Sequence, residues 1–256
     1  MQDWNSQQYL LFAQERTQPA IDLANRIPLA AAERIVDIGS GPGNSTEVVA
    51  RRFPGAAVFG IDSSPAMVEA AGSAYPQFYF QTMDAGADLT ELGSDYDVAF
   101  SNACIQWIPD HPRVIRSWLN LLRPGGVLAV QTPMNYDEPI HQIIGELTTS
   151  PRWQAHFPEP RIFYNLHPGA YYDLLAESAS DFALWSTTYY HKMKSHQAIL
   201  EWYRSTGLRP YLAALSDDLR PVFEAEVMAQ VIQRYPPQRN GEIIFRFPRF
   251  FFLAIR

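Results

Sequence analysis

Apolar residues follow a helical spacing at the start of the chain and alternate between strand and helix patterns after it. Over residues 5–27 they recur at helical intervals, and Pro19 is expected to divide this stretch into two helical pieces. From residue 35 onwards, short apolar runs alternate with amphipathic stretches. Strands are expected at residues 35–38, 58–61, 78–82, 96–101 and 127–132, and helices at residues 45–53, 65–75 and 110–122. This alternation predicts a doubly wound α/β sheet that binds ligands at the carboxyl ends of its strands.

The second half of the chain has a different pattern. Residues 137–177 are rich in Pro, His and aromatic residues and are expected to form helix and loop. Strands are expected at residues 182–190 and 242–256, and helices at residues 195–204 and 221–234. Pro248 would remove a ladder hydrogen bond, so it is expected at a bulge or an edge. With no internal repeat or low-complexity linker, we expect one domain over residues 1–256. Its core is residues 35–133, and residues 1–30 and about 137–235 form a helical cap.

Composition narrows the class of protein. The 256 residues are 47% hydrophobic and 18% charged with a net charge of −7, which argues against a basic nucleic-acid surface. Cys104 is the single cysteine, so no intrachain disulfide can form. The first residues lack the pattern of a signal peptide, and no run of 18 apolar residues is present. We therefore expect a cytoplasmic protein that spans no membrane.

A glycine-rich loop follows the first expected strand. Gly39, Gly41 and Gly43 let the backbone turn tightly and approach a ligand at a helix N-terminus. The sixth place of the loop is Asn44, where a dinucleotide-binding fingerprint has glycine, and no Gly-Lys-Ser/Thr follows. The loop therefore differs from both the dinucleotide fingerprint and the phosphate-binding P-loop.

Three acidic residues end successive expected strands. Asp37 precedes the glycine loop, where two compatible roles are open. It holds the loop by accepting backbone N–H groups, or it accepts a ligand's ammonium group directly or through water. Asp62 ends the second strand, where a carboxylate accepts the two hydroxyls of a ribose; the alternative is a cap for the helix that starts near Pro65. Asp84 follows the third strand and is placed to accept from an adenine amine. The series predicts a nucleotide-like ligand.

Five stretches resemble the class I S-adenosylmethionine-dependent methyltransferases. They are VDIGSGPG, FGIDSSPAM, QTMDA, DVAFSNACIQWIPD and LLRPGGVLAVQTP, and they lie within residues 35–133. The resemblance implies a Rossmann-like sheet of seven strands, mostly parallel with an antiparallel last strand, which fits residues 242–256. It also implies S-adenosyl-L-methionine as the methyl donor and S-adenosyl-L-homocysteine as the product.

Residue roles carry over with this resemblance. The glycines would line the methionine part of the donor, Asp62 the ribose, and Met67, Asp84 and Ala85 the adenine, with Asn102 and Trp107 beside the sulfonium. The expected cofactor-binding residues are Asp37, Gly39, Gly41, Gly43, Asn44, Asp62, Ser63, Met67, Asp84, Ala85, Asn102 and Trp107.

The N-terminal segment and the second half resemble those family members that methylate a carboxylate of a small polycarboxylic acid to a monomethyl ester. Arginine suits the remaining carboxylates because its guanidinium binds them bidentately, although each arginine taken alone also fits an ordinary surface charge. The expected substrate-binding residues are Trp4, Tyr9, Arg16, Arg152, Arg161, Tyr164, Tyr203 and Arg209. A carboxylate is ionised at pH 7, so no general base is required. The sequence also lacks a clustered Cys/His metal-ligand spacing, and no metal is expected.

Two other functions stay open from the residues alone. One is a methyltransferase that acts on oxygen, nitrogen or carbon of another small molecule. The other is a nicotinamide-dependent oxidoreductase, which Asn44 at the sixth loop place and the pair of Asp62 and Asp84 disfavour. A thermal-shift comparison of S-adenosylhomocysteine with NAD separates the two classes of cofactor.

Overall fold

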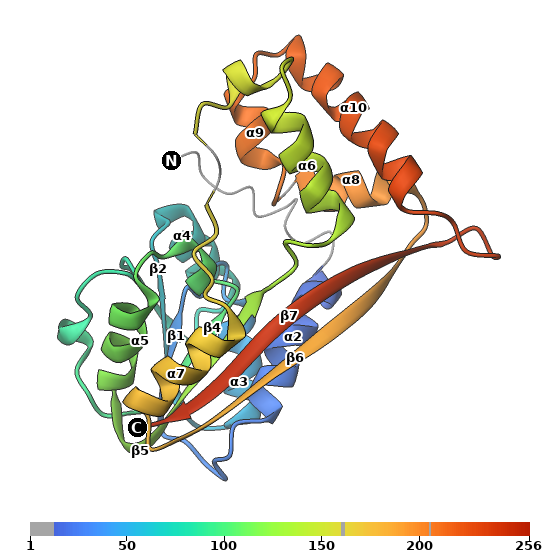
Figure 1. Cartoon of the computed structure of the whole chain (residues 1–256). Coiled ribbons are helices and arrows are strands. Elements are labelled where there is room, and N and C mark those ends of the chain that lie inside the picture. The colour runs from blue at the N-terminus through green and yellow to red at the C-terminus, as the bar shows by residue number, and fades with distance from the viewer. Residues whose placement is uncertain (1–12, 160–161, 205) are drawn as a thin grey trace. The chain divides into compact units, whose positions relative to one another are not determined.

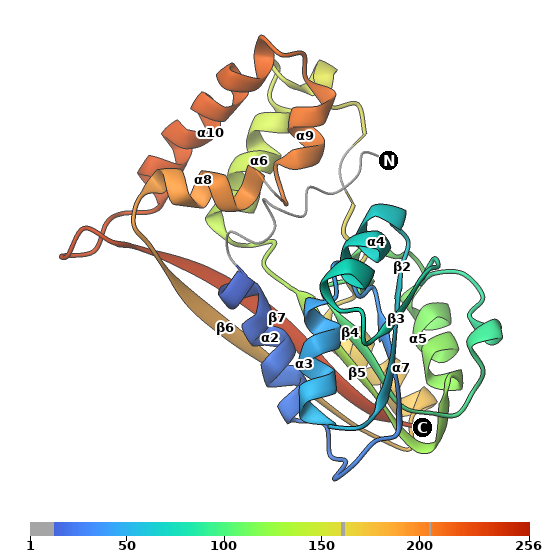
Figure 2. The same ribbon diagram turned by 180° about the vertical axis from the view of Figure 1, so that it is seen from behind.

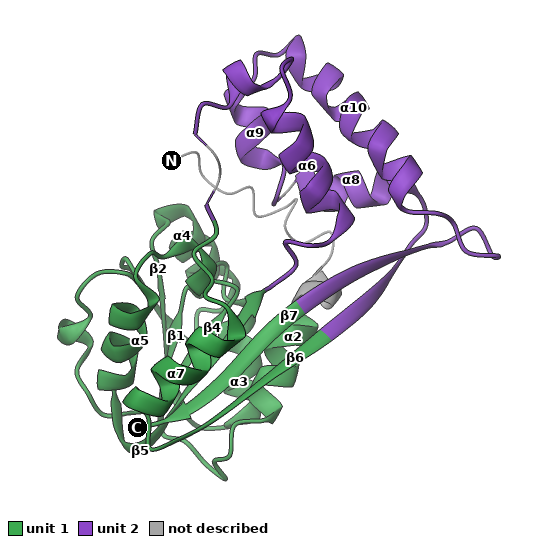
Figure 3. Cartoon of the chain, viewed as in Figure 1, with its two compact units in different colours: residues 1–133, 163–187, 249–256 green, residues 134–162, 188–248 purple. Residues whose placement is uncertain are grey.

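The computed structural model describes residues 13–159, 162–204 and 206–256, without the side chains of residues 13–16. The chain divides into two compact units (Figure 3). Unit 1 consists of Met1–Pro133, Phe163–Thr187 and Arg249–Arg256, and unit 2 of Met134–Ile162 and Thr188–Pro248. Of the range 137–235 that we expected to form a cap, residues 163–187 therefore group with the sheet core, and the rest falls in unit 2. The role of unit 2 as a cap stays a prediction.

Seven strands form one sheet in the order β3-β2-β1-β4-β5-β7-β6. Their bounds are β1 Arg34–Ile38, β2 Ala57–Asp62, β3 Tyr79–Thr82, β4 Tyr96–Asn102, β5 Leu122–Pro133, β6 Asp181–Met193 and β7 Ile243–Ile255. The pairs β1–β2, β1–β4, β2–β3 and β4–β5 are parallel, whereas β7 is antiparallel to β5. The prediction of a seven-stranded, mostly parallel sheet with an antiparallel last strand is confirmed.

Helices cover both faces of the sheet in unit 1. Their bounds are α2 Ala13–Asn25, α3 Asn44–Arg52, α4 Pro65–Ala74, α5 His111–Asn120 and α7 Pro168–Ser178, with short 3₁₀ turns η2 at Thr90–Leu92 and η3 at Ile105–Trp107. The helices α5 and α7 lie over the face seen in Figure 1, and α2 and α3 over the face seen in Figure 2. On the α7 face, the Tyr171 ring lies 5.3 Å from that of Phe250 and 5.5 Å from that of Phe252. The core is therefore closed on both faces, as a parallel sheet requires.

Unit 2 is mainly helical. It contains α6 Pro139–Thr149, η4 Gln154–His156, α8 His196–Arg204, α9 Arg209–Ala214 and α10 Leu219–Arg234, together with parts of β6 and β7. Its own aromatic core includes Trp153 against Phe223, with ring centroids 5.0 Å apart, and Trp202 against Phe245 at 5.9 Å. No helix in the described part of the chain is long and apolar enough to cross a membrane.

Two proline expectations had different outcomes. The prediction that Pro19 breaks the first helix is wrong, because α2 runs through it from Ala13 to Asn25. Burial of Leu23 and its neighbours against the sheet offsets the one backbone hydrogen bond that the proline cannot donate. The antiparallel register between β5 and β7 is unbroken from the pair Val127–Ile255 to the pair Pro133–Arg249. Pro248 is the next residue of β7 and lies just outside this paired stretch.

Candidate functional site

The loop after β1 has three glycines with positive φ. Gly39 has φ +76°, and a Cβ on it would lie 2.3 Å from the Cys104 Sγ. Gly43 has φ +91°, and a Cβ on it would lie 2.6 Å from the Tyr75 ring. Gly41 has φ +54°, but a Cβ there would meet no atom of the described residues within 4 Å. Two of the glycines therefore allow close packing inside the protein, whereas Gly41 faces space that the described residues leave open and that a ligand can use.

Asp37 lies beneath this loop and is fully buried. Its Oδ2 accepts hydrogen bonds from the Ser45 and Thr46 hydroxyls of α3, each at 2.7 Å. Its Oδ1 is buried and has no hydrogen-bond partner among the described residues. Burial raises the pKa of the carboxyl to about 6, in spite of those two hydrogen bonds. Asp37 thus ties the loop to α3 through side chains and keeps one oxygen for a further donor.

Asp62 closes the loop from the end of β2. Its Oδ2 accepts from the Gly41 N–H and its Oδ1 from the Ser64 N–H, both at 2.9 Å. Burial raises the pKa of this carboxyl as well. The cap of α4 is Ser64, whose side chain accepts from the Met67 N–H at 3.4 Å. The alternative of Asp62 as the helix cap is therefore wrong.

Ser63, predicted to bind the cofactor, and the predicted adenine-side residues Met67, Asp84 and Ala85 lie close by in the sequence. Ser63 is exposed, and Met67 is buried on α4. The exposed Asp84 accepts from the Gly86 N–H at 2.8 Å. Ala85 is buried, and its carbonyl accepts from the Trp118 Nε1–H at 3.0 Å.

Cys104 lies within electrostatic reach of the three acidic residues at the strand ends. Burial raises the pKa of its thiol, and the negative charges of Asp62, Asp37 and Asp84 raise it further. The three strand-end carboxyl groups therefore lie near enough to Cys104 to act on its thiol electrostatically, at the carboxyl edge of the neighbouring strands β1, β2 and β3. The thiol is protonated at neutral pH, which removes Cys104 as a nucleophile.

The end of β4 completes this region. The Oδ1 of Asn102 is buried without a hydrogen-bond partner among the described residues. Ala103, the next residue, has φ +56°, a conformation that costs free energy for a residue other than glycine. Trp107 on η3 is 39% exposed, and its ring lies 5.1 Å from that of Phe163. The Tyr164 N–H donates to the Gln106 carbonyl at 3.0 Å, so this predicted substrate residue lies beside η3.

These features fit the methionine part of a sulfonium cofactor. Two buried acceptor oxygens, on Asp37 and Asn102, lack donors among the described residues. The open side of Gly41 leaves room for a ligand at the loop. An ammonium group carries three N–H donors and a positive charge, so it matches both needs.

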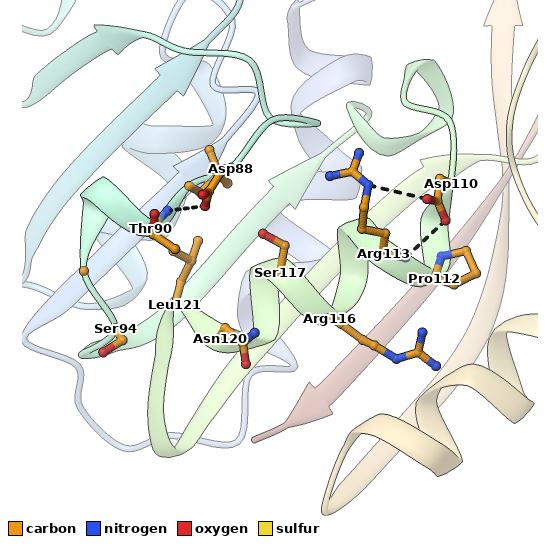
Figure 4. A pocket seen from close by; sticks show the side chains of 12 residues that line it. Asp88, Thr90, Ser94, Asp110, Pro112, Arg113, Arg116, Ser117, Asn120 and Leu121 are labelled. Atoms are coloured by element: carbon orange, nitrogen blue, oxygen red, sulfur yellow. Dashed lines mark hydrogen bonds and ion pairs between the residues drawn. The ribbon is translucent and has the colours of Figure 1, made fainter.

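A surface pocket of about 840 Å³ lies elsewhere on unit 1, along α5 (Figure 4). In the close-up, Arg113 and Asp110 point toward each other at one end, with an ion-pair distance of 3.4 Å. Its lining residues are Asp88, Leu89, Thr90, Gly93, Ser94, Asp110, Pro112, Arg113, Arg116, Ser117, Asn120 and Leu121. None of them is a predicted site residue, so this pocket carries no part of the candidate site.

Three predicted substrate residues lie in unit 2. Arg152 pairs with Glu226 at 2.5 Å and lies over the Trp153 ring at 5.3 Å. The buried Tyr203 hydroxyl lies 3.0 Å from the His141 Nε2 and accepts from the Asn135 Nδ2 at 3.3 Å. Arg209 is half-buried at the start of α9. Trp4, Tyr9, Arg161 and the side chain of Arg16 lie outside the described residues.

The sequence analysis did not single out several polar residues that the structure buries. Ser45 and Thr46 are the partners of Asp37, and Gln131 and Arg249 are buried polar residues on β5 and β7. The sequence signal for Gln131 and Arg249 is a polar residue within an otherwise apolar strand, in VLAVQTP and FRFPRFFF respectively. Periodicity alone does not show which of them is buried.

Comparisons with known proteins agree with this geometry. Residues 12–204 match the family model described as a methyltransferase domain. A trans-aconitate 2-methyltransferase of Azoarcus sp. (strain BH72) is 46% identical, with 100% of both chains covered. Another, from Escherichia coli (strain 55989 / EAEC), is 42% identical over 100% of this chain and 99% of that protein.

Two solved structures share the fold. The YcgJ protein of Bacillus subtilis superposes with a TM-score of 0.58 at 15% identity, covering 93% of this chain and 97% of that chain. Phosphoethanolamine N-methyltransferase 2 of Haemonchus contortus, in complex with S-adenosyl-L-methionine, has a TM-score of 0.55 at 18% identity, covering 97% and 57%. At these identities the likeness concerns the fold alone. With the family model over most of its length and relatives above 40% identity over all of it, the chain belongs to the methyltransferase family, alongside the trans-aconitate 2-methyltransferases.

Proposed function

We propose that this protein transfers the methyl group of S-adenosyl-L-methionine to a carboxylate of trans-aconitate, forming a monomethyl ester. The observation that carries the proposal is the full-length similarity, at 42–46% identity, to proteins named trans-aconitate 2-methyltransferase. The position of the three acids at the ends of the neighbouring strands β1, β2 and β3, with Asp62 hydrogen-bonded to the glycine loop, supports the cofactor part. The cytoplasm is the proposed location, on the basis of the sequence features described above.

The proposed cofactor contacts follow the strand ends. Asp37 would accept from the ammonium group, and the loop of Gly39, Gly41, Gly43 and Asn44 would line the methionine part. Each carboxylate oxygen of Asp62 accepts one backbone hydrogen bond and has a further lone pair. With these lone pairs Asp62 would accept from the ribose hydroxyls. The adenine would lie among Met67, Asp84 and Ala85, with Asn102 and Trp107 next to the sulfonium and Ser63 also in contact with the cofactor.

The protein's residues have a modest chemical task in this reaction. A bound sulfonium supplies an already activated methyl group, and a carboxylate is already a nucleophile at pH 7. The protein has to orient the carboxylate in line with the transferred methyl group and keep water away. His111 has a structural role. Its Nε2 donates to the Ile105 carbonyl at 2.9 Å, and its Nδ1 lies 2.8 Å from the Tyr171 hydroxyl. Burial lowers the pKa of its imidazole.

The acceptor would be held by arginines and tyrosines. The proposed set remains Trp4, Tyr9, Arg16, Arg152, Arg161, Tyr164, Tyr203 and Arg209. Arg152 is paired with Glu226, so it would have to exchange that partner for a carboxylate of the acceptor.

The test is methyl transfer from radiolabelled S-adenosyl-L-methionine to a panel of acceptors. The panel holds trans-aconitate, cis-aconitate, citrate, one neutral phenol and one small primary amine, and the product is identified by mass spectrometry. We expect trans-aconitate to have the highest kcat/KM and to gain one methyl ester. Faster methylation of the neutral compound, or of an amine, would refute the proposed substrate and leave only the methyltransferase family.

A further inference from the structure

Gln131 on β5 carries a buried amide that the described part of the chain does not hydrogen-bond. It has no exposed surface, and neither its Nε2 nor its Oε1 has a hydrogen-bond partner among the described residues. A buried polar group without a partner destabilises the folded state, so native proteins rarely keep one without a reason. Gln106, also buried, shows the ordinary case, because its Nε2 donates to the Ala103 carbonyl at 2.7 Å.

The strand register places Gln131 beside the candidate cofactor site. Gln131 pairs with Asn102 of β4, and Phe100, two residues before Asn102, pairs with Asp37 of β1. Paired residues of neighbouring strands share a face, and so do residues two apart. Asp37, Asn102 and Gln131 therefore lie on one face, the face on which α3 hydrogen-bonds Asp37. All three carry a buried side-chain atom without a partner among the described residues.

Arg249 on β7 belongs to the same neighbourhood. Gln131 lies directly opposite Phe251, and Arg249 is paired with Pro133 at the end of β5. Arg249 is therefore the diagonal neighbour of Gln131 on the same face, a spacing that long side chains bridge. It is only 6% exposed. A buried guanidinium at the carboxyl edge of the sheet supplies a local positive charge in a chain whose net charge is −7.

We infer that Gln131 and Arg249 bind a carboxylate of the acceptor that is not itself methylated. An N–H of the Gln131 amide donates to one carboxylate oxygen, and the Arg249 guanidinium supplies the charge that holds the group. A guanidinium lowers the nucleophilicity of the oxygens that it binds, so the reacting carboxylate is a different one. This inference rests on the proposed function and names residues beyond its arginine and tyrosine set.

The experiment compares Gln131→Met, Gln131→Glu and Arg249→Lys with the wild type. Steady-state KM for trans-aconitate is measured for each protein. Calorimetry gives the Kd for S-adenosylhomocysteine, and then for trans-aconitate added to that complex. Loss of one hydrogen bond to a charged group should weaken acceptor binding about ten- to hundredfold. We expect that loss in Gln131→Met and in Arg249→Lys, and a larger one in Gln131→Glu, where like charges meet. Affinity for S-adenosylhomocysteine should change less than about twofold in all three.

Gln106→Met is the matched stability control. It removes an amide that the fold uses, so its thermal midpoint should fall, whereas that of Gln131→Met should stay or rise. An equal fall in both variants would mean that the fold satisfies Gln131 internally, which would overturn the inference.

Different results would refute the binding role of Gln131 and Arg249 and the proposed function. A wild type that methylates trans-aconitate, with KM and acceptor Kd unchanged in Gln131→Met and Arg249→Lys, would overturn this inference and keep the proposed function. A wild type that neither binds nor methylates any polycarboxylate would overturn both.

Discussion

Replacing Asp37 by asparagine should make the ligand-free protein more stable at neutral pH. The carboxyl is fully buried, accepts 2.7 Å hydrogen bonds from two hydroxyls on Oδ2, and has no partner among the described residues on Oδ1. Burial raises its pKa from the ordinary value of 3.8 to about 6. At pH 7 the fold therefore holds an ionised group that the same chain would solvate better when unfolded.

The magnitude follows from the pKa shift. Between pH 3.8 and about 6 the folded state binds one proton more than the unfolded state at this site. The contribution of Asp37 to stability is thus full below pH 3.8 and is lost as the pH rises to about 6. A shift of about two pKa units, at 1.36 kcal/mol each, corresponds to about 3 kcal/mol. The amide of an asparagine cannot ionise, so Asp37→Asn should exceed the wild type in free energy of unfolding by up to about 3 kcal/mol at pH 7, and by almost nothing near pH 4.

Urea unfolding of both proteins at several pH values between 4 and 8 tests this. Subtracting the two curves isolates Asp37 from the other titrating groups, because these are common to both proteins. S-adenosylhomocysteine, which carries an ammonium group, should bind the wild type more tightly as the pH rises through 6 and should bind the variant at least about tenfold more weakly. A variant less stable than the wild type at pH 7, or a difference independent of pH, would refute the reasoning.

Three further substitutions separate packing from ligand binding in the same loop. Gly39→Ala places a Cβ 2.3 Å from the Cys104 Sγ at φ +76°, so urea unfolding should show a loss of about 2 kcal/mol or more. A Cβ at residue 41 meets no described atom within 4 Å. For Gly41→Val, calorimetry should therefore show cofactor binding abolished while the thermal midpoint falls by only a few degrees, with about 1–2 kcal/mol of backbone strain. Asp62→Ala should weaken S-adenosylhomocysteine binding about ten- to hundredfold with an unchanged circular dichroism spectrum; unchanged affinity would remove the ribose role.

Local patterns determined much of unit 1. Alternating or continuous runs of apolar residues, which end at Gly, Pro or Asp, indicated every strand of the sheet. The strand bounds agree to within a few residues, except that β5 begins earlier, at Leu122. The helices α3, α4 and α5 followed from their amphipathic spacing and from Pro65 near a helix start. These features depend on neighbours along the chain, which is why the sequence alone determines them. The short α9 carried no such pattern, and the division into two units was not anticipated.

The tertiary structure decided what the polar residues do. The sequence placed Asp37, Asp62 and Asp84 at strand ends, but only the strand order β3-β2-β1-β4 makes those strands neighbours and brings the acids within electrostatic reach of Cys104. Pro19 lies inside α2 because burial of the helix against the sheet outweighs its local preference. Whether a polar side chain within a strand is solvated or buried without a partner depends on residues far away in the chain. For Gln131 those residues come from β4 and β7, where it pairs with Asn102 and Phe251, and no local pattern encodes these pairings.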